Sequence, residues 1–273
     1  MNFRVGNSAF IPGLPAVRPG WHPAGPVRPR PALLECHHRD VRVLVPASSG
    51  SGDPVTPDEL YGVARPRLDG RPWVGLCMIA SLDGTTVVDG RSGGLGNPTD
   101  VAVLGALRRA ADMIIVGAAT VRTERYGAPR KPGQRIGVVT STADIDPDTE
   151  LFTSGAGFLI LPEDGPRAPR GAGGPVETIR AGQGRVDLAA ALARLGELGE
   201  SPTFVQAEGG SHLNGSLLDA GCVDELNLTW SPVLAGGDGP RVTSGGHATM
   251  TRLRLAHLAT DDDSYVYGRW VRS

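Results

Sequence analysis

The sequence predicts an α/β fold in which a mixed, mainly parallel central sheet is flanked by helices and ends in antiparallel strands. From residue 41 onward, short apolar runs alternate with helical patterns, and the order strand–helix–strand implies parallel strands with helices on both faces. Two further strand patterns, 253–258 and 265–271, close the chain as a predicted hairpin. For 273 residues, one domain over 41–273 is the simplest organisation.

The pattern of apolar residues predicts the individual elements in order. Residues 73–80 have the length and composition of a buried strand. Pro98 suits the first turn of a helix over 98–111, and an amphipathic helix is predicted over 187–198. The other predicted elements are strands at 112–117, 136–140, 157–161, 176–180, 203–207 and 223–231, and a helix at 211–220.

Residues 1–40 have a different composition from the rest of the chain. Seven prolines, from Pro12 to Pro31, recur too often for a helix or a central strand. We therefore expect a disordered arm rich in proline and arginine, with no catalytic consequence. Binding of a partner or an anionic surface by this arm is the alternative, but basic arms alone are weak signals.

Charge and cysteine content exclude several classes of protein. The formal net charge of -2 favours neither nucleic acid nor membrane as a partner. There is no apolar run of about 18 residues, as a membrane helix requires, and the first residues lack the apolar core of a secretory signal. The three cysteines (Cys36, Cys77 and Cys222) form neither a disulfide framework nor a CxxC metal site. We expect a cytoplasmic protein without a metal site.

Two predicted strands end in residues that could contact a ligand. Asp83 follows the strand at 73–80, at the kind of strand end where α/β proteins bind ligands, although Asp83-Gly84 is also a common turn pair. The strand at 112–117 runs into Gly117-Ala-Ala-Thr120, where small side chains let a ligand approach the backbone.

The most specific local signal is the stretch Glu208-Gly-Gly-Ser-His-Leu213 between a predicted strand and a predicted helix. Two glycines expose backbone N–H groups at the start of that helix, where the helix dipole favours a phosphate. A plain glycine turn is the alternative. The stretch does not match GxGxxG and lies late in the chain, which argues against a Rossmann dinucleotide fold.

Taken together, these motifs resemble those of one enzyme family. They are Met78–Gly84, Gly90–Ser92, Val116–Val121, Val139–Ser141, Glu208–Gly210, Val223–Leu226 and Pro232–Gly236. In this order and spacing, they make 41–273 similar to the reductase (C-terminal) domain of the riboflavin-biosynthesis deaminase–reductase, which has a dihydrofolate-reductase-like fold. The sequence looks closest to stand-alone members without the deaminase half, since it lacks the HxE and PCxxC zinc signature.

The resemblance implies an NADPH-dependent reductase of riboflavin biosynthesis and suggests a homodimer. Its implied substrate is 5-amino-6-(5-phosphoribosylamino)uracil, reduced to the ribityl product by hydride transfer to ribose C1′. A dihydrofolate or pterin reductase on the same fold, and a non-catalytic NADP-binding protein, are the alternatives, because a fold does not fix a substrate.

The resemblance also assigns roles to individual residues. Asp83 and Glu208 are the candidate catalytic carboxylates for the proton transfers. The implied contacts to the cofactor come from Thr120, Ser141, Gly209, Gly210, Ser211, His212 and Leu213. The implied contacts to the substrate come from Ser92, Arg108, Glu124 and Glu208.

Two positions depart from the family pattern. Glu124 stands where the family commonly has Asp, which moves the carboxylate by about one bond length and can alter substrate fit. The segment Thr140-Ser141-Thr142 has no arginine for a 2′-phosphate. The preference for NADPH over NADH is therefore not explained by this segment.

Overall fold

The computed structural model describes residues 41–45, 55–247 and 250–273. These residues all belong to one structural unit. The predicted arm over 1–40 lies outside the described residues, so its disorder and the boundary at residue 40 stay predictions. No helix in the described residues is long and apolar enough to cross a membrane.

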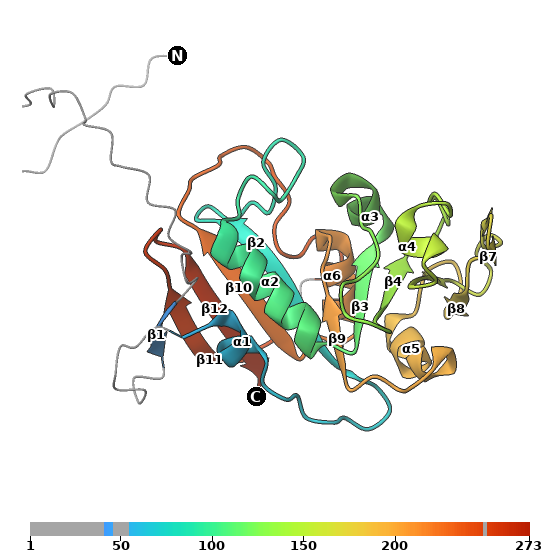
Figure 1. Ribbon diagram of the computed structural model, residues 1–273, viewed down its shortest axis with the longest axis horizontal. Coiled ribbons are helices and arrows are strands. Elements are labelled where there is room, and N and C mark those ends of the chain that lie inside the picture. The colour runs from blue at the N-terminus through green and yellow to red at the C-terminus, as the bar shows by residue number, and fades with distance from the viewer. Residues whose placement is uncertain (1–40, 46–54, 248–249) are drawn as a thin grey trace, which may run out of the picture. The chain divides into compact units, whose positions relative to one another are not determined.

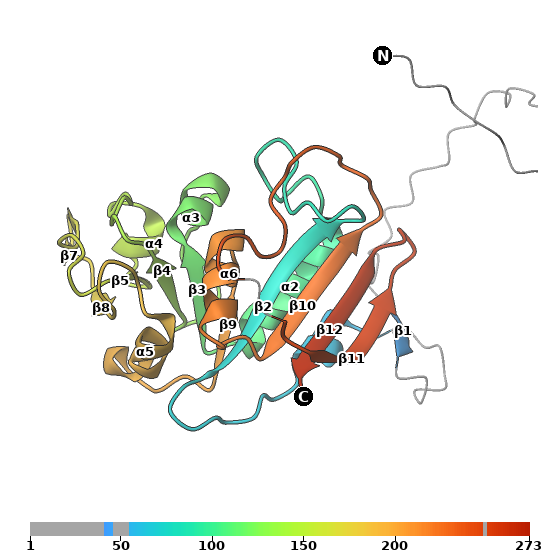
Figure 2. The same ribbon diagram turned by 180° about the vertical axis from the view of Figure 1, so that it is seen from behind.

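A ten-stranded sheet forms the centre of this unit (Figures 1 and 2). Its strands lie side by side in the order β1 (Arg42–Val45), β11 (Leu253–Thr260), β12 (Val266–Arg272), β10 (Glu225–Ser231), β2 (Trp73–Ser81), β9 (Phe204–Ala207), β3 (Met113–Gly117), β4 (Arg135–Val139), β5 (Gly157–Leu161) and β8 (Thr178–Arg180). All neighbours from β10 to β8 pair parallel, and β1, β11, β12 and β10 pair antiparallel. The predicted fold class is therefore confirmed.

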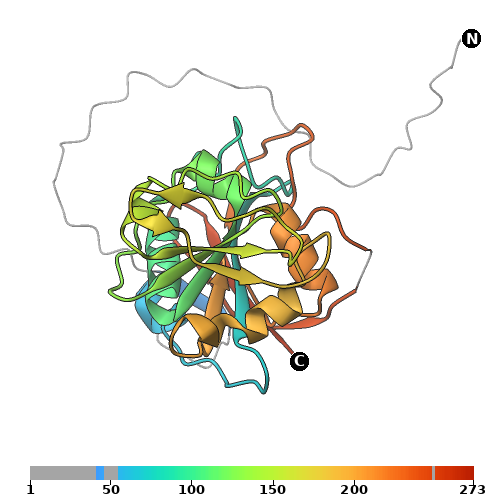
Figure 3. The same cartoon turned by 90° about the vertical axis from the view of Figure 1, so that its right-hand side faces the viewer.

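Helices cover the two faces of the parallel strands (Figure 3). On one face pack α1 (Pro57–Tyr61), α2 (Pro98–Ala110), α3 (Ala118–Glu124) and α4 (Glu150–Thr153). On the other face pack α5 (Leu188–Ala193) and α6 (Ser211–Asp219). This sandwich buries the strands on both sides, which explains their continuous apolar sequences.

Local sequence fixes where several helices begin. The side chain of Asn97 accepts a hydrogen bond from the backbone N–H of Asp100, and Pro98 follows at the first helical position of α2. Thr56 and Glu59 cap the start of α1 reciprocally, as a capping box.

The structure corrects two predicted elements. The helix predicted over 187–198 is divided, because α5 stops at Ala193 and a 3₁₀ turn occupies Leu195–Leu198. The strand predicted over 176–180 begins only at Thr178, and the residues before it, Gly174–Pro175 (β7), pair with Arg170–Gly171 (β6) in a small separate hairpin. Gly196 falls within the first segment, and Gly174-Pro175 stands directly before the second; both residue types disfavour a continuous helix or central strand.

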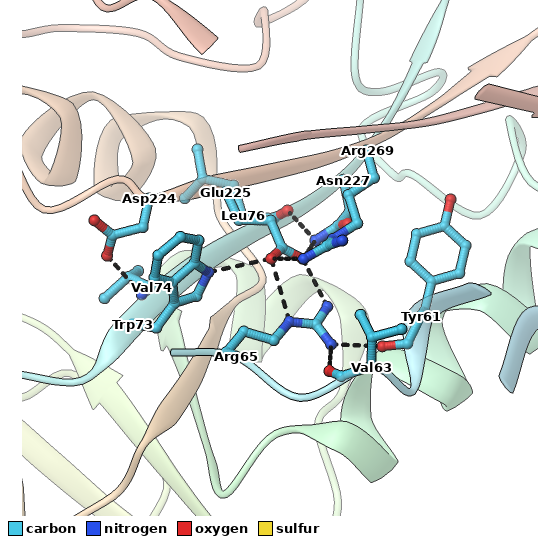
Figure 4. A network of polar contacts seen from close by, with 10 residues as sticks. All are labelled: Tyr61, Val63, Arg65, Trp73, Val74, Leu76, Asp224, Glu225, Asn227 and Arg269. Carbon is cyan, nitrogen blue, oxygen red and sulfur yellow. Dashed lines mark hydrogen bonds and ion pairs between the residues drawn. The ribbon is translucent and has the colours of Figure 1, made fainter. Parts of the chain in front are cut away.

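A buried ionic cluster stabilises the amino end of β10 (Figure 4). The Glu225 carboxylate accepts hydrogen bonds from Arg65, Arg269, Trp73 and Asn227. Burial alone would raise the pKa of Glu225, but the bonds from Arg269 and Arg65 outweigh it and hold the pKa at about 2. Loss of one partner from a buried pair of this kind costs about 3–5 kcal/mol, because the other charge stays buried.

His257 packs beside this cluster and gives the fold a pH dependence. Its ring meets the Tyr61 ring edge-on at 4.8 Å between centroids, and its Nε2 has no partner among the described residues. Burial, with the nearby Arg269, lowers the pKa of His257 from 6.5 to about 4. The folded state therefore holds this imidazole neutral at pH values where the unfolded chain protonates it.

We predict that His257→Phe makes the stability less dependent on pH between 6.5 and 4. In the wild type, the contribution of His257 is fully present above pH 6.5 and is lost as pH falls toward 4, by roughly 3 kcal/mol over the whole interval. Urea unfolding across this range measures it. Parallel curves for wild type and variant would contradict the prediction.

Candidate active site

A cleft of about 1240 Å³ opens at the carboxyl ends of the parallel strands. The ends of β2, β3, β4 and β9 and the start of α6 line it, together with residues from α2 and α3. The cluster around Glu225 lies at the opposite ends of the strands, because Glu225 begins β10. Ligand binding at the carboxyl edge is usual for parallel α/β sheets.

Glu208 forms the centre of one side of the cleft, directly after β9. Its side chain is 3% exposed, and the carboxylate forms a two-pronged ion pair with Arg108 of α2, at 2.7 Å from Nε to Oε1 and 2.6 Å from Nη2 to Oε2. The Tyr126 hydroxyl donates to Oε2 at 2.6 Å, and the Gln206 side-chain amide donates to Oε1 at 2.7 Å. These four hydrogen bonds fix the orientation of an otherwise costly buried carboxylate.

The same cluster controls the protonation of Tyr126. Burial and the negative charge of Glu208 raise the pKa of the Tyr126 hydroxyl well above 10. The hydroxyl therefore keeps its proton and remains a donor to Glu208 or to a ligand. Glu208, Arg108 and Tyr126 together offer a carboxylate, a cation and a neutral O–H within one corner of the cleft.

A second polar pair lies between α3 and the loop after β2. Glu124 Oε1 accepts hydrogen bonds from the backbone N–H and the hydroxyl of Ser92, both at 3.0 Å. Both residues also line the cleft. The structure thus brings together two residues, 32 positions apart, that the sequence analysis assigned to the substrate.

The turn after Glu208 has the geometry of an anion cradle. Gly209 has φ +75°, which favours glycine, and its carbonyl accepts a hydrogen bond from Gly117 N–H at 2.7 Å. A Cβ at Gly210 would lie 3.1 Å from Thr120 Oγ1. The first backbone bond of α6 runs from Asn214 N–H to Gly210 O, so the preceding N–H groups are available to a ligand.

The predicted cofactor residues lie in this part of the cleft. Its lining includes Thr120, Ser141, Gly210, Ser211, His212 and Leu213, and Gly209 forms the adjoining turn. Backbone N–H groups in the first turn of α6 without an intrahelical partner, the absence of a side chain at Gly210 and nearby hydroxyls suit a diphosphate. The residues present therefore fit a dinucleotide cofactor.

Asp83 lies elsewhere. It is exposed and borders a separate hollow of about 240 Å³ with Gly236–Gly239. Its carboxylate accepts hydrogen bonds from Ser81 Oγ, from Gly236 N–H at 2.6 Å and from Ala235 N–H at 3.1 Å. The bonds from Ser81 and Gly236 lower the pKa of Asp83 to about 2. The carboxylate thus anchors the loop after β10, and this position does not support a chemical role in the cleft.

That loop forms part of the cleft wall. Pro240 lines the cleft and accepts a hydrogen bond from Thr86 N–H at 2.8 Å, and Val242 O accepts one from the Asn214 side chain at 2.8 Å. Residues 236–242 therefore connect the loop after β2 to α6. Asp83 holds one end of this segment by accepting the hydrogen bond from Gly236 N–H.

Three residues of the site escaped the sequence analysis. Tyr126 and Gln206 contact Glu208, and Asp100 lines the cleft, where burial raises its pKa. Asp100 has the sequence signature of an ordinary first-turn acid in α2, and Tyr126 follows α3 without any periodic pattern. Of these contacts, only the closeness of Gln206 in β9 to Glu208, two residues later, was visible in the sequence. Over the described ranges, no group of three His, Cys, Asp or Glu residues could hold a metal ion.

Comparison with known sequences points to one family. The family model described as RibD C-terminal domain matches residues 72–267. The 2,5-diamino-6-ribosylamino-4(3H)-pyrimidinone 5′-phosphate reductase of Methanothermobacter thermautotrophicus is 32% identical over 205 residues, which cover 70% of this chain and 94% of that protein. The riboflavin biosynthesis protein RibD of Bacillus amyloliquefaciens is 29% identical over 187 residues, or 64% of this chain, and the match spans only 50% of that longer protein.

Solved structures show the same fold. A pyrimidine reductase-like protein from Corynebacterium diphtheriae superposes with a TM-score of 0.67 at 24% identity, over 80% of this chain and 98% of that chain. The riboflavin biosynthesis reductase of Saccharomyces cerevisiae superposes with a TM-score of 0.58 at 19% identity, over 80% and 95% of the two chains.

We predict that Asp83→Asn increases the mobility of the loop after β10, and that Asp83 takes no direct part in the reaction. A neutral amide accepts the two backbone hydrogen bonds more weakly than a carboxylate does. Hydrogen exchange should become faster at the amides of Ala235 and Gly236. Asp238→Asn is the control, because Asp238 borders the same hollow and accepts no side-chain hydrogen bond among the described contacts. A fall in turnover with unchanged exchange at both amides would instead support the catalytic role predicted from the sequence.

Proposed function

The chain belongs to the RibD C-terminal domain family, and from this we propose that it is an NADPH-dependent reductase of riboflavin biosynthesis acting on a ribosylaminopyrimidine 5′-phosphate. The reaction converts the ribosylamino group to a ribitylamino group by hydride transfer to ribose C1′. The relatives from Methanothermobacter, Archaeoglobus and Aquifex are named as reductases of the 2,5-diamino-pyrimidinone. The sequence analysis named the corresponding uracil.

The segment directly after β9 gives the strongest support for this function. The segment Glu208–Ser211 joins a buried carboxylate, held by Arg108 and Tyr126, to a turn with free backbone N–H groups. The carboxylate can accept hydrogen bonds from sugar hydroxyls, and the N–H groups of the turn can donate to a phosphate. The two sites are adjacent in the chain, as a reaction between a phosphorylated cofactor and a sugar requires. Holding both reactants in one orientation supplies much of the catalysis in hydride transfer.

The cofactor would rest on the amides of Gly210–Leu213, with Thr120 and Ser141 beside it. When bound, it supplies the hydride. The residues of this chain bind it, orient it and shield the reacting carbon from water. Gly210 permits the close approach, since a side chain there would fill the space beside Thr120.

Glu208 is the proposed proton carrier for opening of the ribose ring. Its Oε2 is shared by Arg108 and Tyr126, so a sugar hydroxyl can replace one of these donors without leaving the carboxylate unpaired. Arg108 then remains beside the substrate as a cation, and Tyr126 as a neutral donor. Glu124 of α3 and Ser92 of the loop after β2 would also contact the substrate.

Turnover assays test the proposal directly. Consumption of NADPH is followed with the diamino-pyrimidinone nucleotide, with the uracil nucleotide and with dihydrofolate. Turnover of either ribosylaminopyrimidine supports the proposal, and the ratio of their kcat/KM values identifies the substrate. Turnover of dihydrofolate alone, or of none of the three, would refute it.

We further propose that the protein is a homodimer formed through the C-terminal strands. The face of β10, β12 and β11 that lies away from α2 carries half-buried apolar side chains, and none of the described helices covers it (Figure 2). These residues are Trp230, Leu255, Leu258, Val266 and Trp270, with the two tryptophan rings 5.2 Å apart. Aromatic residues on an uncovered apolar face are typical of subunit interfaces.

We predict that Glu208→Gln lowers kcat by about 100-fold, in the range expected for loss of a general acid–base group. The affinity for NADPH should change little, since the amides of the turn remain. Asp58→Asn is the matched control, because it removes a similar two-pronged pair with Arg109 on α2 at an exposed position outside the cleft. An unchanged kcat for Glu208→Gln would remove Glu208 from the chemistry.

We predict that Trp270→Glu produces monomers in sedimentation velocity, because it buries a charge in the proposed interface. Val101→Glu is the control, since Val101 is 61% exposed on α2 outside that face. A wild type that sediments as a monomer at assay concentrations would refute the dimer.

A further inference from the structure

The structure brings an arginine to the cleft from a part of the chain that the sequence analysis did not consider. The segment after β4 contributes Thr140, Ser141 and Thr142 to the cleft and no arginine. The loop that follows β8 also reaches the cleft and contributes Gln183 and Arg185. We propose that Arg185 binds the 2′-phosphate of NADPH and determines the preference for NADPH over NADH. This inference rests on the proposed function.

The loop that carries Arg185 has a defined shape. Gly182 has φ +85°, and a Cβ there would lie 2.4 Å from the carbonyl oxygen of Arg185 and 2.6 Å from Asp187 N, so only glycine fits. The Gly182 carbonyl accepts a hydrogen bond from Glu163 N–H at 2.7 Å, and Asp164 accepts one from Gly184 N–H at 2.8 Å. These contacts hold the backbone of Arg185 in place at the cleft.

Arg185 is a cation of the cleft without a partner among the described residues. Its side chain is exposed and takes part in none of the hydrogen bonds or ion pairs of the described residues. Arg122 also lines the cleft, but it pairs with Asp144 at 3.3 Å. A guanidinium that no carboxylate neutralises is suited to a phosphate, which it can bind through two parallel hydrogen bonds.

The acidic groups at this end of the cleft are already engaged. Asp187 caps α5 by accepting a hydrogen bond from Ala190 N–H at 3.0 Å. Asp219 accepts two hydrogen bonds from His247 N–H, at 3.0 and 3.1 Å. Both carboxylates accept hydrogen bonds from backbone donors, and neither forms an ion pair with Arg185 among the described residues.

The position of Arg185 favours the 2′-phosphate of the cofactor over the 5′-phosphate of the substrate. The substrate residues Glu208, Glu124 and Ser92 lie where β2, β9 and β3 end, whereas Arg185 follows β8, three strands beyond β3 in the order of the sheet. A dinucleotide whose diphosphate rests on the start of α6 and whose nicotinamide faces Glu208 extends its adenosine past Ser141 toward Arg185. The phosphate on that ribose, and not the 5′-phosphate of the substrate, is therefore the one within its reach.

Direct binding measurements test this inference without relying on turnover. Calorimetric titration of wild type and Arg185→Gln with NADP⁺ and NAD⁺ gives the four dissociation constants. We expect Arg185→Gln to raise the Kd for NADP⁺ by about tenfold or more, as for loss of a charge-assisted bond, and to leave the Kd for NAD⁺ unchanged. Arg170→Gln is the matched control, because it removes an exposed arginine of β6 that does not line the cleft.

Other outcomes would overturn the inference. An equal rise for both nucleotides would mean that Arg185 contacts a part that they share, and no change for either would mean that it contacts neither. A raised KM for the phosphorylated substrate, with unchanged NADP⁺ affinity, would assign Arg185 to the substrate's phosphate. If the wild type binds neither nucleotide, the proposed function itself is refuted. If the wild type and Arg185→Gln bind NADP⁺ equally well, only the role of Arg185 is refuted.

Discussion

The four hydrogen bonds to the Glu208 carboxylate are the interaction on which the geometry of the cleft depends. They come from α2, from the segment after α3 and from β9, so one side chain ties together three elements that are distant in the sequence. A buried carboxylate is tolerated only when it is paired in this way. Gly209 and Gly210 follow directly, and the turn that offers its amides to a phosphate is held by the hydrogen bond from Gly117 N–H to Gly209 O.

The two ends of the parallel strands have different roles: the amino ends carry a buried ionic cluster that stabilises the fold, and the carboxyl ends form the cleft. At the amino ends, the buried cluster of Glu225 with Arg65 and Arg269 joins β10 to β12 and to the segment after α1. At the carboxyl ends, the Arg108–Glu208 pair lies beside the cleft, and the first backbone N–H groups of α6 are available to a ligand. The loop anchored by Asp83 belongs to this second end, where it shapes the wall of the cleft from outside.

The sequence predicted the parallel sheet and the Glu208 turn because both depend on local patterns: apolar runs of strand length, and two glycines between a strand and a helix. Through the family resemblance it also assigned Ser92 and Glu124 to the substrate, but it did not predict that the two residues contact each other. Tyr126 was missed because its contact with Glu208 joins positions 82 residues apart, whereas Gln206 was missed although it lies only two residues before Glu208. Arg185 was missed because only the folded chain brings the loop after β8 to the cleft. The catalytic role predicted for Asp83 rested on the family resemblance, since a turn aspartate that faces a cleft and one that anchors a loop have the same sequence signature.

A crystal structure of the protein with bound NADP⁺ tests the central claim most directly. The account predicts the diphosphate on the amides of Gly210–Leu213 and the nicotinamide ring against the corner formed by Glu208, Arg108 and Tyr126. A cofactor bound away from this turn, or a nicotinamide ring on the far side of the cleft from Glu208, would contradict it.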